Sequence, residues 1–323
     1  MIVGLIAAGC LPSAIRARQV DDESILEPIA WIDQQAALVH SARAEFTVKY
    51  LPTIPAEMER ITALCRQRGH EYRAGSYYLS AHQARRRSYH VNWFRKGPLE
   101  REEKAYIARP AIVETTVFDG ELVKTLDGTP GRTCLYISSP ASNWLQKNRI
   151  QPFAFAFEFR SLAHGTLIRE STQRSIVRHA NGSQQRSELV VRHPTEERLI
   201  LRLVYDGQHR LVEREAILTA ASPMMQLDHD EAAVYSRHEF SEYKPYDDGS
   251  GKRIWFPSKA VLRYYLGKLS DGSPVQSQAI QVDVLDIEFN APVADEKFTV
   301  RAPEGVPVFD RRHDNYATVA VSY

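Results

Sequence analysis

This sequence of 323 residues has almost no net charge, since 41 lysines and arginines face 40 aspartates and glutamates. A balanced chain has no long-range field that would draw in nucleic acid, so we expect no nucleic-acid partner. The sequence also lacks an apolar run of the roughly 18 residues that a membrane-spanning helix needs. Membrane association is therefore expected only through a covalent lipid anchor.

Short catalytic motifs are missing as well. The sequence contains no G-x-S-x-G, H-E-x-x-H or C-x-x-C pattern and no phosphate-binding glycine loop. The nearest approach to a metal site is the succession Asp228, His229 and Asp230. In an extended segment His229 would face away from both aspartates, so we interpret this stretch as a solvated acidic loop. We expect no enzyme activity, no cofactor and no metal.

Only three cysteines are present, Cys10, Cys65 and Cys134, and none has the spacing of a metal site. If Cys10 is lipidated or removed, one pair remains. An exported compartment would then allow Cys65 and Cys134 to form a disulfide. Two unpaired thiols buried in the core are the alternative.

The first 24 residues resemble an export signal, because an apolar stretch is followed by small and then polar residues. Ala7-Ala8-Gly9-Cys10 fits a lipobox, after which Cys10 would carry lipid. Ile15-Arg16-Ala17 offers a signal-peptidase site instead, and a buried N-terminal strand is a third interpretation. We predict that residues 1–24 are an export or lipoprotein signal with a short linker, and that the protein is periplasmic or associated with the outer membrane.

Two helices are predicted after this segment. The first covers about residues 26–42 and carries an apolar stripe of Ile29, Ile32, Ala36 and Val39. Ser24 and Glu27 have the spacing of a capping box, although Pro28 fits better as the first helical residue. The second covers about residues 56–68 and is terminated by Gly69. Its apolar face comprises Met58, Ile61, Leu64 and Cys65.

Most of the remaining chain alternates between apolar and polar residues, as strands do. Asp119-Gly120, Asn181-Gly182 and Asp206-Gly207 separate alternating segments and predict hairpins. Between Val284 and Leu285 the alternation slips, which indicates a β-bulge. The segment from Pro140 to Arg174 is harder to interpret, although four phenylalanines between 153 and 159 recur at every second position and favour an extended conformation. We predict a single domain over residues 25–323, with about 11 antiparallel strands and a helical insertion near 56–68.

Three stretches resemble the LolA/LolB/LppX-like family of bacterial lipoprotein carrier and sorting proteins. They are the helix-then-strand opening ILEPIAWIDQQAALVHSARAEFTVKY, the two Asp-Gly hairpins, and the close DIEFNAPVADEKFTVRAPEGVPVFD. The resemblance implies a mainly β fold of class α+β, in which a large curved antiparallel sheet, or half-open β-barrel, wraps around the N-terminal amphipathic helix. It also implies that Phe298 and Phe309 plug the end of the barrel.

Such a fold implies an apolar cavity between helix and sheet that binds a lipid or an acylated protein. The expected lining residues are Trp31, Leu38, Phe46, Val48, Tyr50, Val117, Leu201, Leu203 and Tyr205. The alternative is that these side chains fill the core without a void. The protein would then be a non-catalytic sensor or scaffold that binds a protein partner of the envelope.

Residues 82–97, HQARRRSYHVNWFRKG, are basic and aromatic. We interpret them as a solvated β face beside a core face. Binding to an acidic partner or to lipid headgroups is the functional alternative.

Overall fold

The structure, a computed structural model, describes residues 22–139, 171, 174–181, 184–192, 199–219, 233–312 and 319–321. Its strands form one 15-stranded sheet in the order β15-β14-β6-β5-β4-β3-β2-β1-β13-β12-β11-β10-β9-β8-β7. The first six are β1 (Ser41–Leu51), β2 (Tyr89–Lys96), β3 (Leu99–Tyr106), β4 (Arg109–Phe118), β5 (Val123–Asp127) and β6 (Cys134–Ser138). The others are β7 (Arg174–Asn181), β8 (Gln184–Arg192), β9 (Leu199–Asp206), β10 (Leu211–Leu218), β11 (Ala233–Asp247), β12 (Arg253–Lys268), β13 (Pro274–Phe289), β14 (Val308–Asp310) and β15 (Val319–Val321).

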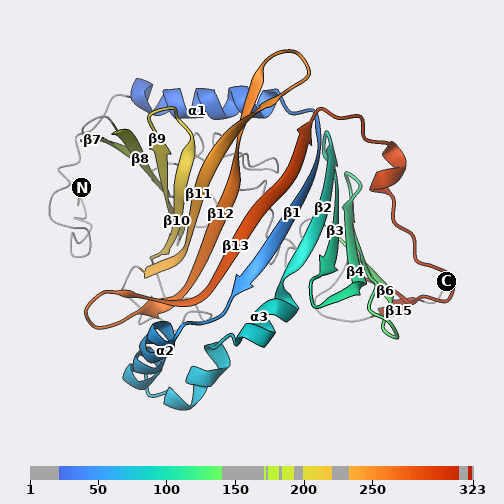
Figure 1. The fold of residues 1–323 in the computed structure, drawn as a ribbon, viewed down its shortest axis with the longest axis horizontal. Helices are drawn as coiled ribbons and strands as arrows, with labels where there is room; N and C mark the ends of the chain where they lie inside the picture. Colours follow the sequence, from blue (N-terminus) through green and yellow to red (C-terminus); the bar gives the residue numbers. More distant parts are fainter. Residues whose placement is uncertain are drawn as a thin grey trace, which may run out of the picture.

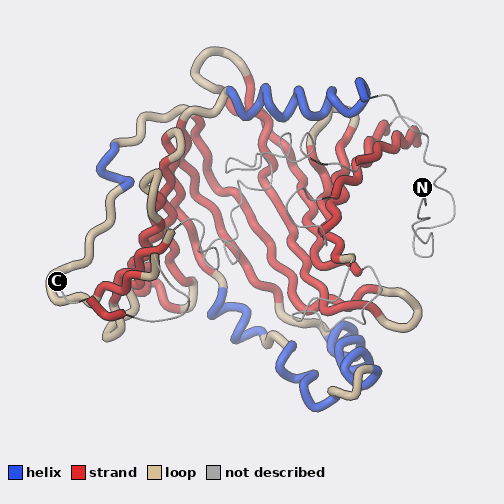
Figure 2. Tube along the Cα trace, turned by 180° about the vertical axis from the view of Figure 1, so that it is seen from behind, coloured by secondary structure: helices blue, strands red, loops and turns tan. Residues whose placement is uncertain are grey.

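The predicted fold class is confirmed, because the sheet is curved and open (Figures 1 and 2). Neighbouring strands are antiparallel throughout the long strands, and β14 runs parallel to β6. The sequence did not lead us to expect β3, which is mostly charged, or the short strands β6, β14 and β15. These additions explain why about 11 expected strands became 15.

The predicted hairpin turns connect β4 to β5 and β9 to β10, and an aspartate stabilises each of them. Asp119 Oδ1 accepts hydrogen bonds from the backbone N–H groups of Glu121 (3.1 Å) and Leu122 (2.8 Å). Asp206 Oδ1 does the same for two backbone N–H groups of its own turn. An aspartate side chain that bonds the backbone ahead of it favours the reversal of the chain.

The predicted bulge is confirmed in β13. Glu45 of β1 pairs with Asp286 and the next residue, Phe46, pairs with Val284, so Leu285 is the extra residue. Its side chain is 61% exposed. The bulge therefore turns one leucine out of the sheet and restores the alternation on either side.

The first helix, α1 (Asp22–Ala37), begins and ends earlier than predicted. Pro28 lies inside it, so the expectation that Pro28 begins the helix is wrong. The apolar stripe is confirmed, since Ile29 and Ile32 are each 2% exposed and Val39 is 6% exposed. In Figure 1 α1 crosses the ends of the strands at one end of the sheet.

A helical insertion, residues 52–88, separates β1 from β2. It comprises α2 (Pro55–Gln67), the 3-10 helix η1 (Glu71–Tyr77) and α3 (Ala81–Arg87). The second predicted helix is confirmed as α2, which buries Ile61, Leu64 and Cys65 in a cluster completed by Val275 of β13. A capping box of Ser80 and Gln83 starts α3. None of the helices in the described ranges has the length and hydropathy of a membrane span.

The possible disulfide between Cys65 and Cys134 is not formed, because both cysteines are free and buried. Cys65 lies in the cluster under α2, whereas Cys134 belongs to β6 near the other end of the strand order. The alternative of two buried thiols therefore applies. Cys10, Asp228, His229 and the segment 140–170 lie outside the described residues.

The closing stretch also differs from its expected role. Phe298, in the 3-10 helix η2 (Asp295–Phe298), packs with Val117 and Val293 in a small separate cluster. Phe309 of β14 stacks on Tyr136 of β6, with ring centroids 5.4 Å apart. Neither ring belongs to the main apolar cluster, so neither plugs the end of a barrel.

Candidate functional site

The main feature of the molecule is a continuous cluster of buried apolar side chains on the concave side of the sheet, which we call the apolar face. Alternate residues of β1, namely Ala42, Ala44, Phe46 and Val48, point to this side and are at most 4% exposed. Their neighbours on β2 and β13 continue the pattern. The resulting cluster includes residues of β2, β1, β13, β12, β11, β10, β9 and β8.

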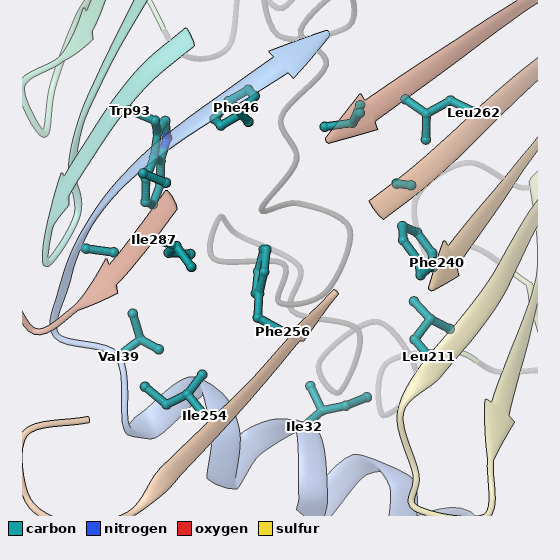
Figure 3. Packing of buried hydrophobic residues seen from close by; sticks show 14 of the residues in the cluster. Ile32, Val39, Phe46, Trp93, Leu211, Phe240, Ile254, Phe256, Leu262 and Ile287 are labelled. Carbon is teal, nitrogen blue, oxygen red and sulfur yellow. The ribbon is translucent and has the colours of Figure 1, made fainter. Parts of the chain in front are cut away.

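Figure 3 shows how this cluster is assembled. Phe46 and Trp93 point inward from one arm of the curved sheet, and Leu211 and Phe240 point inward from the other. Residues so far apart in the strand order can share one cluster because the sheet curves toward this side. The apolar face is therefore a product of curvature as well as of alternation.

The helix α1 closes one end of the apolar face. Ile32 reaches into the cluster from the helix (Figure 3). Gln35 is only 5% exposed, and its Oε1 accepts a hydrogen bond of 2.8 Å from the backbone N–H of Trp255 at the start of β12. A buried amide that is satisfied by the sheet fixes the helix in rotation as well as in position.

Eight of the nine predicted lining residues belong to this cluster or pack against it. Phe46, Val48, Leu201, Leu203 and Tyr205 are its buried members, and Trp31, Leu38 and Tyr50 are half-buried at its margin. Val117 is a correction. Its neighbour Thr116 pairs with Glu102, which lies opposite Trp93 of the apolar face, so Val117 points to the convex side and packs with Phe298.

The end of the apolar face opposite α1 is bordered by tyrosines, which we call the tyrosine belt. Its five members, from β3, β2, β1, β12 and β11 in that order, are Tyr106, Tyr89, Tyr50, Tyr264 and Tyr235. Tyr89 is buried, and the other four are half-buried. The register places Tyr106 beside Tyr89, with ring centroids 5.9 Å apart. Tyr235 and Tyr264 are 6.2 Å apart.

Burial raises the pKa of two belt tyrosines, Tyr264 and Tyr50. Desolvation raises the pKa of Tyr264 to about 12. It also raises the pKa of Tyr50, although the charges of Lys104 and Arg87 act against the rise. At neutral pH these hydroxyls therefore remain neutral groups that can both donate and accept hydrogen bonds.

One histidine lies next to the belt. His238 of β11 is 5.8 Å from the ring of Tyr264, between ring centroids. Burial lowers its pKa to about 3, and the charge of Arg214 adds to the effect. His238 is therefore neutral in the folded protein at neutral pH.

Beyond β2 the concave side becomes polar. Trp93 Nε1 donates a hydrogen bond of 3.0 Å to Glu100 Oε1. Lys104 Nζ lies 3.0 Å from Glu102 Oε1 and 3.1 Å from Glu114 Oε1. The apolar face therefore has a border at β3.

Apart from Tyr50, sequence reasoning missed the tyrosine belt, and it missed this polar border. Each belt tyrosine stands near the end of a different strand, and a count of 15 tyrosines in the chain says nothing about which ends meet. The register of strand pairing across the sheet decides which of these tyrosines lie side by side. The one usable signal is that β3 places charges at every second position, opposite the apolar residues of β2.

A hollow lies away from the apolar face. It has a volume of about 530 Å³ and lies between β6, β14 and the loops before them. Its lining includes Arg132, Cys134, Tyr136 and Phe309. Within the described ranges no group of three or more histidine, cysteine or acidic side chains is arranged to hold a metal ion.

No protein-family model and no curated protein sequence matches this chain. Several solved structures are similar to it, and three of them are as follows. A DUF1329 family protein from Desulfovibrio piger has a TM-score of 0.47 and 9% identity, over 86% of this chain and 96% of that one. A putative outer membrane lipoprotein-sorting protein domain from Vibrio parahaemolyticus has a TM-score of 0.41 and 11% identity, over 84% of this chain and 95% of that one.

A LolA superfamily protein from Nitrosomonas europaea has a TM-score of 0.44 and 9% identity, over 84% of this chain and 97% of that one. Two of these three names agree with the resemblance described above. Since each TM-score is below 0.5, the site and its chemistry rest on the residues of this chain alone.

Proposed function

We propose that this protein binds a lipid, or the acyl chains of a lipidated protein, on its apolar face and acts as a non-catalytic carrier or sorting protein of the bacterial envelope. One observation supports the proposal above all others. A single apolar cluster extends from β2 to β8, closed at one end by α1 and bordered at the other by half-buried tyrosines. Such a surface suits a ligand with an apolar body and a polar end.

The energetics fit a carrier that must also release its ligand. Burying about ten methylene groups at roughly 0.8 kcal/mol each contributes about 8 kcal/mol. That corresponds to a dissociation constant of about 1 μM before the cost of ordering the chain is subtracted. No covalent or metal-mediated step is needed.

The belt would receive the polar end of the ligand. Protonated hydroxyls of Tyr50 and Tyr264 can donate hydrogen bonds to the ester or amide oxygens of an acyl group. The rings themselves give apolar contact to the first methylenes, as tyrosines do at the boundary between lipid and water.

Export and anchoring complete the proposal. An N-terminal signal over residues 1–24, with lipidation of Cys10 or cleavage near Ala17, would deliver the protein to the periplasm or to the outer membrane. Mass spectrometry of the mature N-terminus distinguishes the two cleavage sites, since only the first leaves a lipidated cysteine.

Two matched variants test the binding site. Val48 and Val117 are both 0% exposed valines, one on the apolar face and one in the convex cluster. Val48→Phe is expected to weaken the binding of fluorescently labelled palmitate at least about tenfold, because the added ring occupies ligand volume. Val117→Phe serves as the control for overpacking and should leave the affinity within about twofold.

A second measurement does not depend on a folded variant. Lipids extracted from the purified protein and identified by mass spectrometry should include acyl chains in stoichiometric amount. A protein that neither retains lipid nor binds the probe would contradict the carrier proposal. It would favour the scaffold alternative, in which the apolar face is only a filled core.

A further inference from the structure

The helical insertion, residues 52–88, lies beside the tyrosine belt. Figures 1 and 2 both place it at the end of the sheet opposite α1. Its last helix, α3, packs on β1, and the charge of Arg87 acts on the hydroxyl of Tyr50. The insertion therefore stands next to the end of the apolar face that α1 leaves uncovered.

The insertion carries a charge that the rest of the molecule does not. It contains seven arginines and three glutamates, whereas the whole chain has a net charge of +1. Two of the glutamates are held inside the insertion, because Glu57 pairs with Arg60 and Glu71 pairs with Arg66. What remains is an excess of positive charge at one end of a nearly neutral protein.

Four of the arginines are directed to solvent. Arg73, Arg85, Arg86 and Arg87 are exposed, and none forms an ion pair with another described residue. Arg73 instead lies over the ring of Tyr72, with its Cζ 5.5 Å from the ring centroid. Exposed guanidinium groups that form no ion pair within the protein can bind anionic groups outside it.

Large apolar side chains accompany these charges. Ile54 is 58% exposed and Tyr72 is 78% exposed, and they are two of the four large hydrophobic side chains exposed in the described part of the chain. A surface that combines arginine with an exposed aliphatic and an exposed aromatic side chain has the composition of an interfacial membrane anchor.

We propose that the helical insertion docks the protein on an anionic lipid bilayer. The arginines would bind lipid phosphates, and Ile54 and Tyr72 would enter the headgroup region. A bilayer is favoured over an acidic protein because the arginines are spread over η1 and α3 and are accompanied by isolated apolar side chains. A flat charged surface accepts that arrangement without a shaped groove. The inference goes beyond ligand binding, although it would place the belt end of the apolar face at the membrane.

The test uses flotation of the full chain with vesicles. We expect the protein to float with vesicles of phosphatidylcholine and phosphatidylglycerol, not to float with phosphatidylcholine alone, and to be partly released by salt. The triple variant Arg73→Gln, Arg85→Gln, Arg86→Gln should lower the partition coefficient at least about tenfold, since each lysine or arginine near an anionic surface contributes about a factor of five.

A control variant removes the same charge elsewhere. Arg43, Lys244 and Arg253 are exposed cations on β1, β11 and β12, away from the insertion. Their triple replacement by Gln should leave flotation within about twofold if position matters. An equal loss of flotation in both triple variants would show that only the net charge of the protein matters, and it would overturn the proposal.

Two further outcomes complete the test. Tyr72→Ser should weaken the binding that survives at high salt, and an unchanged value would exclude insertion of the ring. Failure to float with anionic vesicles would overturn the inference outright. Binding of labelled palmitate, measured on the same Arg73, Arg85 and Arg86 variant, should be unaffected, so a failure of docking is separable from a failure of ligand binding.

Discussion

Asn290, the residue after β13, joins three separate segments through its side chain. Its Oδ1 accepts hydrogen bonds from the backbone N–H groups of His40 (2.8 Å) and Ser41 (3.3 Å). Its Nδ2 donates to the carbonyl oxygens of Leu38 and Asp248, each at 2.8 Å. One amide therefore connects the end of α1, the start of β1 and the hairpin between β11 and β12.

We expect Asn290→Ala to lower the free energy of unfolding by about 2–4 kcal/mol, because several hydrogen bonds of about 1 kcal/mol each are lost. The backbone adds to this cost, since Asn290 has a φ of +57°, where asparagine and glycine are tolerated better than alanine. Asn290→Gly separates the two contributions, because it removes the amide and keeps the backbone relaxed. In urea denaturation, the free energy of unfolding of Asn290→Gly should lie between those of the wild type and Asn290→Ala. Equal stability of all three proteins would refute the role of the side chain.

His238 makes folding sensitive to acid. In the unfolded chain a histidine takes up a proton as the pH falls through about 6.5. In the folded protein burial first, and the charge of Arg214 second, lower the pKa of His238 to about 3. Between these values the unfolded state binds more protons, so the free energy of unfolding decreases as the pH falls.

The expected decrease from this residue is at most about 1.4 kcal/mol per pH unit over that window. Thermal melts of wild type and His238→Phe at pH 7 and pH 5 test it, and the variant should lose less stability between the two. His82→Gln, on the exposed side of α3, is the control. A wild-type slope retained in His238→Phe would assign the acid sensitivity to other groups.

Individual residues were predicted well where alternation alone decides, and badly where register decides. Phe46 and Val48 were placed correctly on the apolar face, because a strand exposes alternate residues to alternate sides. Val117 alternates equally well, but the side it faces depends on which strands pair with β4, and that information is not local. Of the belt tyrosines only Tyr50 was predicted, and the other four were missed for the same reason.

Among the elements, the strands β8, β9 and β10 are held together on the convex side by one arginine. Arg202 Nε lies 2.9 Å from Glu188 Oε1, and Arg202 Nη1 lies 2.5 Å from Glu213 Oε1 and 3.0 Å from Glu215 Oε2. The side chain of Glu215 is only 6% exposed. Without Arg202, Arg237 alone would compensate this carboxylate.

We expect Arg202→Met to lower the free energy of unfolding by about 2–4 kcal/mol, because it breaks a largely buried ionic network. Arg43→Met is the matched control, since Arg43 pairs with Glu288 at 2.8 Å while both side chains are at least 50% exposed. An exposed pair contributes about 0–1 kcal/mol. Chemical denaturation should separate the two variants, and equal effects would show that burial of the network does not matter.

Elements with strong periodicity were predicted within a residue or two. Helix α2 has a clear apolar stripe and Gly69 at its end, with a φ of +71°, so its boundaries follow from local chemistry. Helix α1 was placed too late because Pro28 suggested a first turn. Strand β3 was missed because its charged residues occupy both sides, and the charges on the concave side are satisfied by ion pairs that only the folded sheet provides.

For the molecule as a whole, the sequence predicted hairpins and a curved sheet but not the order of the strands. Consecutive strands joined by an Asp-Gly turn must be neighbours, so β4–β5 and β9–β10 followed directly. The adjacency of β1 and β13 could not be predicted, because no local signal links segments that are so distant along the chain. The parallel pairing of β14 with β6 was equally inaccessible.

The pairing of β1 with β13 determines when during synthesis the sheet can finish folding. Around this seam, residues about 250 positions apart come together, and it joins the arm formed by β2 to β6 with the arm formed by β12 to β7. During synthesis the first arm must wait, with an unpaired edge, until nearly the whole polypeptide has been made. Slow folding that ends with the closing of this seam is the expected consequence.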